Sequence, residues 1–411
     1  MGEVTSDVPP AAPRSSWHRF WAAATISSIG SAVTAVAMPV LVVQQLAATP
    51  FEVGVVNAAQ FVPYAVLGLI AGVYVDRWRR KTILIWASIG RALALGAVPV
   101  LWVTGVLQIW MLVIALLCFG AFSVFGFAAT QSLLPRLVPK ARLVSANARL
   151  DQSDAAATTL GPAMGGGLVG LLGAPVAIAV DAISYLVDAA LNAGVKVEEP
   201  RSHARTDTVR TQIRDGVQWT YRHHTLRPLA VSTHMWFFAN GASMTVLSLL
   251  ALRSLGFTAS MFGLLLATFG VTSLLGASIA PWSGTRFGSG RVIILERVAY
   301  PIAWLLVAMA SSTGAGHVLL FFALALQGFA ASLCNANEMG YWQTLTPDGL
   351  LGRVNATRRS INRTIAALGA LSAGLLVGLI GDRPTLFAAV VVFTAAALVA
   401  ARSPLRAPPR G

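Results

Sequence analysis

The sequence predicts an all-α membrane protein with twelve transmembrane helices in two pseudo-symmetric six-helix bundles. Of its 411 residues, 56% are hydrophobic and only 11% are charged, which is too apolar for a water-soluble core. Apolar runs of ~20 residues, the length that crosses a bilayer, recur along the chain. They form two sets of six on either side of a polar stretch at 196–227.

The two sets also resemble each other in sequence. A shift of 208 residues aligns LPRLVPKARLVSANA in the first half with LTPDGLLGRVNA in the second, with five identities in twelve aligned positions. Both segments follow the fourth apolar run of their half. The pattern indicates a duplication that produced two parallel six-span units related by an axis along the membrane normal.

The predicted spans are 20–43, 52–73, 82–104, 109–132, 153–173, 175–195, 229–252, 259–282, 292–312, 316–338, 361–381 and 384–401. They define bundles at 16–195 and 228–402, tails at 1–15 and 403–411, and a linker at 196–227. In the linker, Val209, Ile213, Val217 and Thr220 share one helical face. This pattern predicts an amphipathic helix at the inner leaflet, with a solvated linker as the alternative.

The cations are distributed unequally between the two sides of the predicted membrane. Of 30 Lys and Arg residues, 26 fall in tails or loops on one side and two, Arg253 and Arg383, on the other, while Arg91 and Arg297 lie within spans. The positive-inside rule therefore places both termini in the cytoplasm of a multi-pass cell-membrane (inner or plasma membrane) protein. Topology and lipid headgroups explain the net charge of +14 better than nucleic acid does.

Several chemistries are excluded by the motifs that are missing. Cys118 and Cys334 each lie in an apolar run, so we expect no disulfide framework and no thiolate metal site. The sequence contains no GxxxxGK[ST], GxSxG or HExxH motif. We therefore expect neither an enzyme nor an ATP-driven pump, and no cofactor.

A charged hairpin, GVYVDRWRRK, separates the second and third spans. Gly72 allows two helix ends to approach closely, and Asp76 is suited to pairing across the turn or to capping a helix. Arg77, Arg80 and Lys81 follow at once. Topology alone requires the cations but neither Gly72 nor Asp76.

With this hairpin, the duplicated loop and twelve spans, the chain resembles the major facilitator superfamily over about residues 15–402. The hairpin residues match the superfamily signature between the second and third spans. The resemblance implies transport by alternating access, in which these charges latch the cytoplasmic side shut in the outward-facing state. Driven by an ion gradient, such a carrier needs no bound cofactor.

A small-residue motif in the fifth span, GPAMGGGLVG, contains Gly161, Pro162, Gly165 and Gly166. It resembles the signature of antiporter-type exporters of the superfamily, although ordinary helix packing is an alternative. The segments LPRLVPKARLVSANARL and VDAISYLVDAAL resemble the branch that holds macrolide-efflux and siderophore (enterobactin-like) exporters.

Ionisable groups within spans are costly and are candidates for ion coupling. Asp181 and Asp188 in the sixth span are seven residues apart, within ~20° of two helical turns, so they share a face. A pair of carboxylates in an apolar setting suits a reversible proton site, with Asp188 the better candidate and a structural role the alternative. Glu338 and His234 are further proton-coupling candidates.

Two intramembrane arginines call for different explanations. Arg91 lies about ten residues, or ~15 Å, into the third span, where a structural pair with Asp154 or Asp151 is favoured over substrate contact. Glu296 and Arg297 lie near the end of the ninth span, where we expect both to snorkel to the membrane interface.

A cavity for an amphipathic substrate should combine aromatic surface with sparse polar groups. The residues that fit this description, each with helix packing as the alternative, are Asn57, Gln60, Gln131, Asn240 and Gln327 as polar groups and Trp236 and Phe237 as aromatic groups.

The sequence thus predicts a monomeric, proton-coupled exporter of an amphipathic small molecule such as a drug, a macrolide or a siderophore. Its partners are the substrate and membrane lipids. A lipid or lysophospholipid carrier, or a nutrient importer of the same fold, is the first alternative. A non-transporting membrane sensor is the second.

Overall fold

The structure, a computed structural model, describes residues 13–197, 199 and 209–406; most of the predicted tails and the middle of the linker lie outside this part. The helices are α1 (Arg14–Val40), α2 (Pro50–Ala59), α3 (Val62–Arg77), α4 (Arg80–Val103), α5 (Ile109–Leu137), α6 (Leu143–Leu172), α7 (Ala174–Ala193), α8 (Val209–Arg222), α9 (Leu226–Leu249), α10 (Ala259–Phe287), α11 (Ser289–Met309), α12 (Gly314–Leu345), α13 (Asp348–Ile380) and α14 (Asp382–Ala401). Short helical turns are η1 (Leu41–Gln45), η2 (Lys140–Arg142), η3 (Leu250–Ser254) and η4 (Pro404–Arg406).

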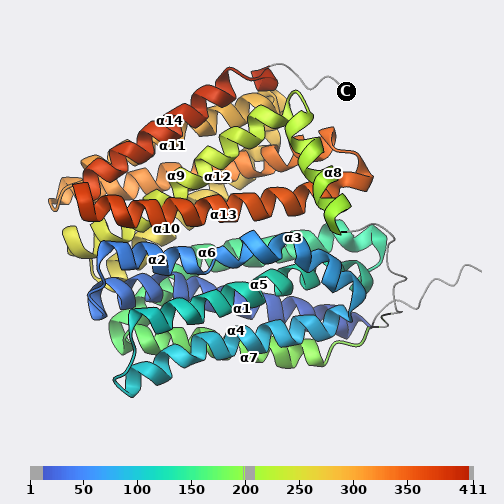
Figure 1. Cartoon of the computed structure of the whole chain (residues 1–411), viewed down its shortest axis with the longest axis horizontal. Coiled ribbons are helices and arrows are strands. Elements are labelled where there is room, and N and C mark those ends of the chain that lie inside the picture. The colour runs from blue at the N-terminus through green and yellow to red at the C-terminus, as the bar shows by residue number, and fades with distance from the viewer. Residues whose placement is uncertain (1–12, 198, 200–208, 407–411) are drawn as a thin grey trace, which may run out of the picture.

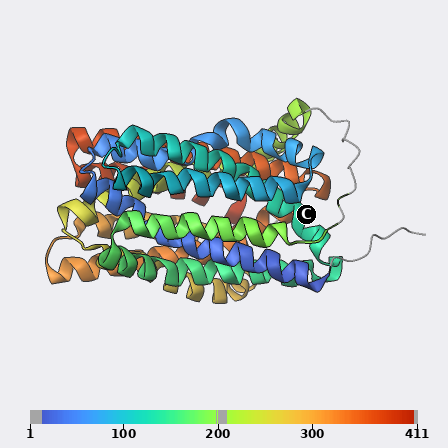
Figure 2. The same cartoon turned by 90° about the horizontal axis from the view of Figure 1, so that it is seen from below.

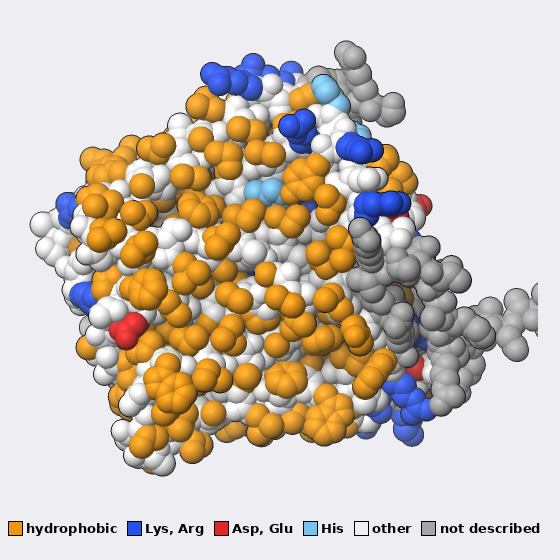
Figure 3. Space-filling view, in the orientation of Figure 1, with side chains coloured by type: hydrophobic (Ala, Val, Ile, Leu, Met, Phe, Trp, Pro, Cys, Tyr) orange, Lys and Arg blue, Asp and Glu red, His pale blue; other side chains and the backbone are white. Residues whose placement is uncertain are grey.

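The predicted fold class is confirmed. Within the described chain, twelve helical segments are long and apolar enough to cross a membrane. Figures 1 and 2 show them side by side, with α1–α7 in one bundle, α9–α14 in the other and α8 across one end. We call the end where α1 begins and α14 ends the terminal face, and the other end the opposite face. Apolar side chains cover the side of the bundles seen in Figure 3, and cations gather at the terminal face.

Three helices exceed their predicted spans by seven residues or more at the terminal face. α6 begins at Leu143 instead of 153, α12 continues to Leu345 instead of 338, and α13 begins at Asp348 instead of 361. Hydropathy detects only the apolar part of a helix, whereas these ends continue as polar, hydrogen-bonded turns. As a result Arg358 and Arg359 lie inside α13, not in the loop to which the charge count assigned them. The count also assigned Arg363 to that loop, which is wrong, because Arg363 lies both within the predicted span 361–381 and within α13.

The second predicted span is broken into α2 and α3. Helix α2 ends at Ala59 and α3 begins at Val62, so Gln60 lies at the break. Pro63 lacks the N–H and clashes with the carbonyl four residues earlier, which accounts for the interruption. The carbonyl of Gln60 approaches α5 so closely that a Cβ added at Gly120 would lie 2.3 Å from it.

Two related π-helical turns join the bundles at the opposite face. η1 and η3 begin 209 residues apart, close to the 208-residue repeat. Gln44 in η1 donates hydrogen bonds from Nε2 to the carbonyls of Leu252 (3.3 Å) and Phe257 (3.0 Å). Its counterpart in η3, Arg253, donates from Nη2 to the carbonyl of Ala48 (2.5 Å). We call these reciprocal contacts the opposite-face latch.

Glycine pairs close the two seams between the bundles. A Cβ at Gly54 in α2 would lie 2.9 Å from the Cα of Gly374 in α13. In the second seam, a Cβ at Gly263 in α10 would lie 2.9 Å from the Cα of Gly166 and 2.3 Å from the carbonyl of Pro162, both in α6. Only residues without a Cβ permit backbones to approach this closely.

The other two motif glycines pack within the N-terminal bundle. A Cβ at Gly161 would lie 2.3 Å from the Cβ of Ala32 in α1, and one at Gly165 would lie 3.0 Å from the Cα of Val33. The GPAMGGG segment therefore faces α1 on one side and the partner bundle on the other.

The charged hairpin is described through Arg80 and Lys81, since the side chains of Gly72, Asp76 and Arg77 lie outside the described part. The carboxylate of Glu199, which follows α7, caps the N-terminus of α4. It accepts hydrogen bonds from the backbone N–H groups of Arg80 (2.6 Å) and Lys81 (3.0 Å). An anion is favourable here because these first N–H groups have no intrahelical acceptor.

We expect Glu199→Ala to lower the free energy of unfolding by about 1 kcal/mol, the usual value of a lost helix cap. Glu199→Gln keeps an acceptor oxygen without the charge and should lose about half as much. Thermal unfolding of the full chain in detergent, followed by tryptophan fluorescence, measures both effects. Equal stability of all three proteins would contradict this role of Glu199.

The amphipathic helix α8 is present, and part of the predicted face packs against α13. Its position at the inner leaflet stays a prediction. Thr220 is buried, and a Cβ at Gly216 would lie 2.8 Å from the carbonyl of Arg353 in α13. Asp215 also forms an ion pair with Arg353, with Oδ2 of Asp215 2.6 Å from Nη1 of Arg353. The extended start of α13 supplies this docking surface, which the predicted span boundary omitted.

Candidate functional site

Each bundle contains a polar pocket bordered by its first span. The pocket of the N-terminal bundle, about 400 Å³, is lined from α1, α4, α6 and α7 by Ser27, Ser28, Ser31, Ala32, Ala35, Arg91, Asp154, Ala157, Thr158, Pro162 and Tyr185. The pocket of the C-terminal bundle, about 330 Å³, is lined from α9, α11, α12 and α13 by Thr233, Trp236, Phe237, Glu296, Arg297, Ala331, Ser332, Cys334, Asn335, Glu338, Met339, Arg358 and Asn362. We call them the first and second pockets.

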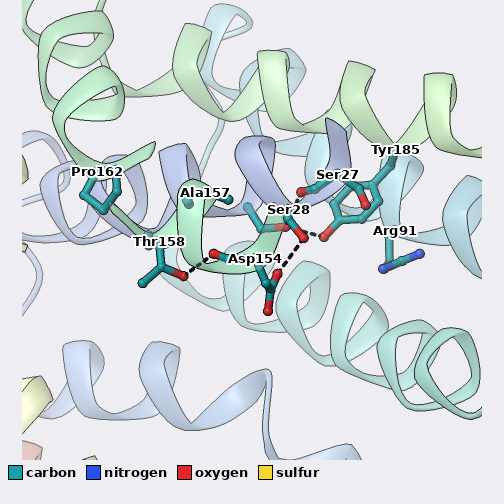
Figure 4. Close-up of a pocket in the computed structure, with 11 residues that line it drawn as sticks. Ser27, Ser28, Arg91, Asp154, Ala157, Thr158, Pro162 and Tyr185 are labelled. Carbon is teal, nitrogen blue, oxygen red and sulfur yellow. Dashed lines mark hydrogen bonds between the residues drawn. The ribbon is translucent and has the colours of Figure 1, made fainter. Parts of the chain in front are cut away.

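Hydroxyl groups of α1 form one wall of the first pocket (Figure 4). Ser28 donates a hydrogen bond to the carboxylate of Asp154 at 2.7 Å. Ser31 shares a hydrogen bond of 2.7 Å with the hydroxyl of Tyr185. These contacts connect α1 to α6 and α7 and give the pocket polar groups from three helices.

A buried ion pair lies beside the first pocket. Nη2 of Arg91 in α4 is 3.7 Å from Oδ2 of Asp188 in α7 and donates a hydrogen bond to Ser88 at 2.9 Å. The guanidinium also lies over the ring of Tyr185, 4.3 Å from its centroid. Arg91 lines the pocket whereas Asp188 does not, so the arginine separates the carboxylate from the pocket.

The carboxylate of Asp188 has two further donors. Ser88 donates to Oδ2, and Asn192, one turn along α7, donates to Oδ1 at 3.1 Å. Asp188 is therefore fixed by three neighbours at 4% exposure. Such pairing is what a buried charge requires. Arg91 thus has an intramembrane partner as expected, but the partner is Asp188, since Asp154 is turned toward Ser28.

Asp181 lies on the same buried face of α7 as Asp188, as the seven-residue spacing predicts. It is fully buried and accepts a hydrogen bond from Ser184 at 3.2 Å, while its Oδ2 has no partner among the described residues. A Cβ at Gly30 in α1 would lie 2.5 Å from Oδ1. The carboxyl group is therefore enclosed between α1 and α7.

Four charged side chains meet in the second pocket. Arg297 pairs with its neighbour Glu296 and, at 2.9 Å, with Glu338 of α12. Arg358 of α13 pairs with the other oxygen of Glu338 at 3.0 Å. Thr233 bridges the group, since it accepts from Arg297 at 3.0 Å and donates to Glu338 at 3.2 Å. We call the four charged residues the charge cluster.

The burial of Glu296 and Arg297 corrects the expectation that they snorkel to the interface. They are 2% and 3% exposed, so neither reaches the membrane surface. Both point into the bundle because Glu338 and Arg358, on other helices, balance their charge. Distance from a helix end could not reveal these partners. The charge cluster contains two acids and two bases, so its formal charge is zero, and this pairing offsets part of the free-energy cost of burying the four charges.

His234 connects the linker helix to the C-terminal bundle. Its ring nitrogens lie 2.6 Å from the hydroxyl of Tyr221 in α8 and 2.8 Å from Oδ1 of Asn362 in α13. It does not line either pocket. These contacts suit the structural alternative, and a proton-coupling role for His234 stays a prediction.

Of the predicted cavity residues, Trp236 and Phe237 line the second pocket, and the other five lie outside both pockets. Asn57 donates across the bundles to Thr245 at 3.2 Å, and Gln327 is fully buried with both amide atoms unpartnered among the described residues. Gln60 lies at the helix break, Gln131 is exposed and Asn240 is half-buried.

Several pocket residues were not among the sequence candidates. The hydroxyl wall of the first pocket has a signal in the segment ISSIGS, where Ser27, Ser28 and Ser31 follow helical spacing. Arg358 and Asn362 are also one turn apart, but the predicted boundary of the eleventh span hid the arginine.

The relatives of the chain are membrane transporters. A family model described as transmembrane secretion effector matches residues 9–409. The uncharacterized MFS-type transporter YfiS of Bacillus subtilis is 26% identical over 375 residues, 88% of this chain and 86% of that protein. The multidrug efflux pump Tap of Mycolicibacterium fortuitum is 27% identical over 379 residues, 89% of this chain and 90% of that protein.

A second named efflux protein matches a shorter part of the chain, and solved structures of low sequence identity share its fold. Macrolide efflux protein A of Streptococcus pyogenes is 29% identical over 127 residues, 31% of either chain. The crystal structure of a mutant of the nucleoside transporter NupG has a TM-score of 0.78 at 12% identity, covering 94% of this chain and 99% of that one. This likeness shows a shared fold.

Proposed function

Because the chain belongs to the transmembrane secretion effector family of the major facilitator superfamily, and is therefore a secondary transporter, we propose that it exports an amphipathic small molecule in exchange for protons. The observation that carries the proposal is the buried pair of Arg91 and Asp188 beside the first pocket. The printed functions of Tap and macrolide efflux protein A support export of a drug-like substrate.

The pair has the chemistry that proton exchange needs. When Asp188 is ionised it holds Arg91, and when it binds a proton it loses most of its attraction for the guanidinium. Arg91 then remains over the ring of Tyr185, on the pocket side of the pair. Proton binding at Asp188 thereby changes the charge presented to a substrate in the first pocket. Binding of the proton and binding of a charged substrate are thereby coupled through this pocket, which is the basis of proton-linked transport.

The proposed orientation places the terminal face in the cytoplasm of a cell membrane. The excess of Lys and Arg at the terminal face supports this orientation. The opposite-face latch and the two glycine seams then close the external side. Export requires these contacts to open once the terminal side has closed.

We expect Arg253→Ala to weaken closure of the external side. Loss of a charged donor to a buried carbonyl costs about 1.5–3 kcal/mol, so the closed state should lose roughly tenfold or more in population. The measurement is labelling of Ser31→Cys in the first pocket by an impermeant maleimide added outside intact cells. Cys118→Ala and Cys334→Ala provide the background.

Labelling from outside should become faster in Arg253→Ala and stay unchanged in the control Arg402→Ala, at the terminal end of α14. Unchanged labelling in both variants would contradict the latch. Faster labelling in inverted vesicles than in intact cells is expected for the parent protein. The reverse order would contradict the orientation.

Growth protection tests the proposed function. Cells that express the chain should survive higher concentrations of some amphipathic compounds in a panel of drugs, macrolides and siderophores than cells without it. A proton uncoupler should remove that protection. Absence of protection against the whole panel, with normal membrane expression, would count against drug export.

One observation favours a second candidate function, a carrier of lipids or lysophospholipids. Arg359 and Arg363 of α13 lie at the seam between the bundles without a carboxylate partner among the described residues. A basic site between helices is what an anionic headgroup would bind.

A further inference from the structure

Two arginines of α13 face the N-terminal bundle across the seam. The guanidinium of Arg359 lies over the ring of Phe127 in α5, 3.2 Å from its centroid, and 5.8 Å from that of Tyr64 in α3. Arg363, one turn further along α13, lies 5.3 Å from the ring centroid of Phe61. Both cations therefore lie on the side of α13 that meets the other bundle.

The helices around these arginines provide no nearby acid. α5 and α9 contain no Asp or Glu. The sole acid of α3 is Asp76, twelve residues and ~18 Å of helix from Tyr64. In α13 the sole acid is Asp348, eleven residues and ~16 Å from Arg359. Among the described residues, the hydrogen-bonding atom Nε of Arg359 is buried without an acceptor.

The preceding residue, Arg358, shows how a paired arginine of the same helix differs from Arg359 and Arg363. Arg358 has a carboxylate partner in Glu338, and that carboxylate also binds Arg297. Glu338 is thus already shared by two guanidinium groups. Arg359 and Arg363 have aromatic faces instead, and cation–π contact offsets only part of the cost of a cation in a membrane. Both guanidinium groups retain N–H donors that match the geometry of an oxyanion.

We propose that Arg359 and Arg363 bind the oxyanion of an amphiphile, a phosphate or a carboxylate, at the seam between α3 and α13. The inference rests on the proposed transport of an amphiphile and adds that a transported or bound amphiphile is anionic. The oxyanion is that of a transported substrate or that of a lipid headgroup.

Binding to the purified full chain in a neutral detergent tests the proposal. The probes are oleate, which carries a carboxylate, lysophosphatidylglycerol, which carries a phosphate, and monoolein, which is neutral and of similar length. We expect the two anions to bind and raise the melting temperature, and monoolein to do neither. The combined variant Arg359→Gln and Arg363→Gln should weaken binding of both anions roughly tenfold or more, because charged hydrogen bonds are lost.

Two controls separate charge recognition from damage to the fold. Arg286→Gln removes an exposed cation at the end of α10 and should leave binding unchanged. The combined variant Arg359→Lys and Arg363→Lys keeps both charges and should recover part of the affinity. Equal binding of monoolein and oleate, or unchanged anion binding in the glutamine variant, would overturn the proposal.

Proteoliposomes distinguish the two sources of the oxyanion. Movement of oleate or lysophosphatidylglycerol across the membrane identifies a transported substrate. Binding without movement, with anionic phospholipid that co-purifies with the parent chain but not with the glutamine variant, identifies a headgroup site. Asp188→Asn should retain anion binding, which is measured without a gradient. Failure of the anion site and failure of proton coupling therefore give different results.

Discussion

Asp188→Asn is expected to abolish uphill transport while leaving substrate exchange intact. The amide retains the shape of the side chain but cannot exchange a proton, so the charge beside Arg91 no longer depends on pH. One proton that crosses about 100 mV is worth ~2.3 kcal/mol, enough for a roughly fifty-fold substrate gradient. In proteoliposomes with an imposed proton gradient, the variant should bring the substrate only to equal concentrations on the two sides.

Asp154→Asn is the matched control, since Asp154 lines the same pocket but bonds Ser28 instead of an arginine. It should keep an uphill gradient. Asp181→Asn tests the other carboxylate of α7, which has no cation partner among the described residues. If Asp181→Asn removed uphill transport and Asp188→Asn did not, the assignment of the coupling residue would be wrong.

Glu338→Ala is expected to lower the free energy of unfolding by about 3–5 kcal/mol, the cost of leaving a buried charge without its partner. Arg297 would retain Glu296, but Arg358 would lose the carboxylate with which it is paired. Thermal unfolding in detergent, followed by tryptophan fluorescence, measures the loss.

A double variant tests whether charge is the cause. Glu338→Gln with Arg358→Met removes the acid and the base together and should be more stable than Glu338→Gln alone, since no lone cation is left. Asp348→Ala, at the exposed start of α13, should cost less than about 1 kcal/mol. Similar losses in Glu338→Ala and Asp348→Ala would contradict the role of the charge cluster.

Structural features that depend on the local sequence pattern could be predicted from the sequence. The spans follow from apolar length, and the common buried face of Asp181 and Asp188 follows from their seven-residue spacing. The repeat reappears in the structure at η1 and η3, where Gln44 and Arg253 make reciprocal contacts. These features require only the geometry of a helix and the thickness of a bilayer.

The parts that depend on partners far apart in the chain could not be predicted. Arg91 binds Asp188 across 97 positions, and Glu338 gathers Arg297 and Arg358 from two other helices. Helix order alone does not fix which faces meet. Glu199 also escaped notice, because a cap donated by a distant segment has no local signature.

The ends of several helices were also predicted too short from the sequence. The terminal ends of α6, α12 and α13 are polar and extend beyond the hydrocarbon core, so apolar length underestimates them. This matters most for α13. Its early start turns Arg358 and Arg359 from loop residues into helical residues, Arg358 in the charge cluster and Arg359 at the seam beside Arg363.

We propose that the protonation of Asp188, through its ion pair with Arg91, also decides which face of the carrier is open. Distances between spin labels measure this directly, with one pair at Asn147 and Asn355 on the terminal face and another at Thr104 and Ser312 on the opposite face. All four residues are exposed. When pH is changed between about 5 and 8, one distance should increase as the other decreases, and Asp188→Asn should abolish both changes. Distances that do not respond to pH, or that respond equally in Asp188→Asn, would contradict the account.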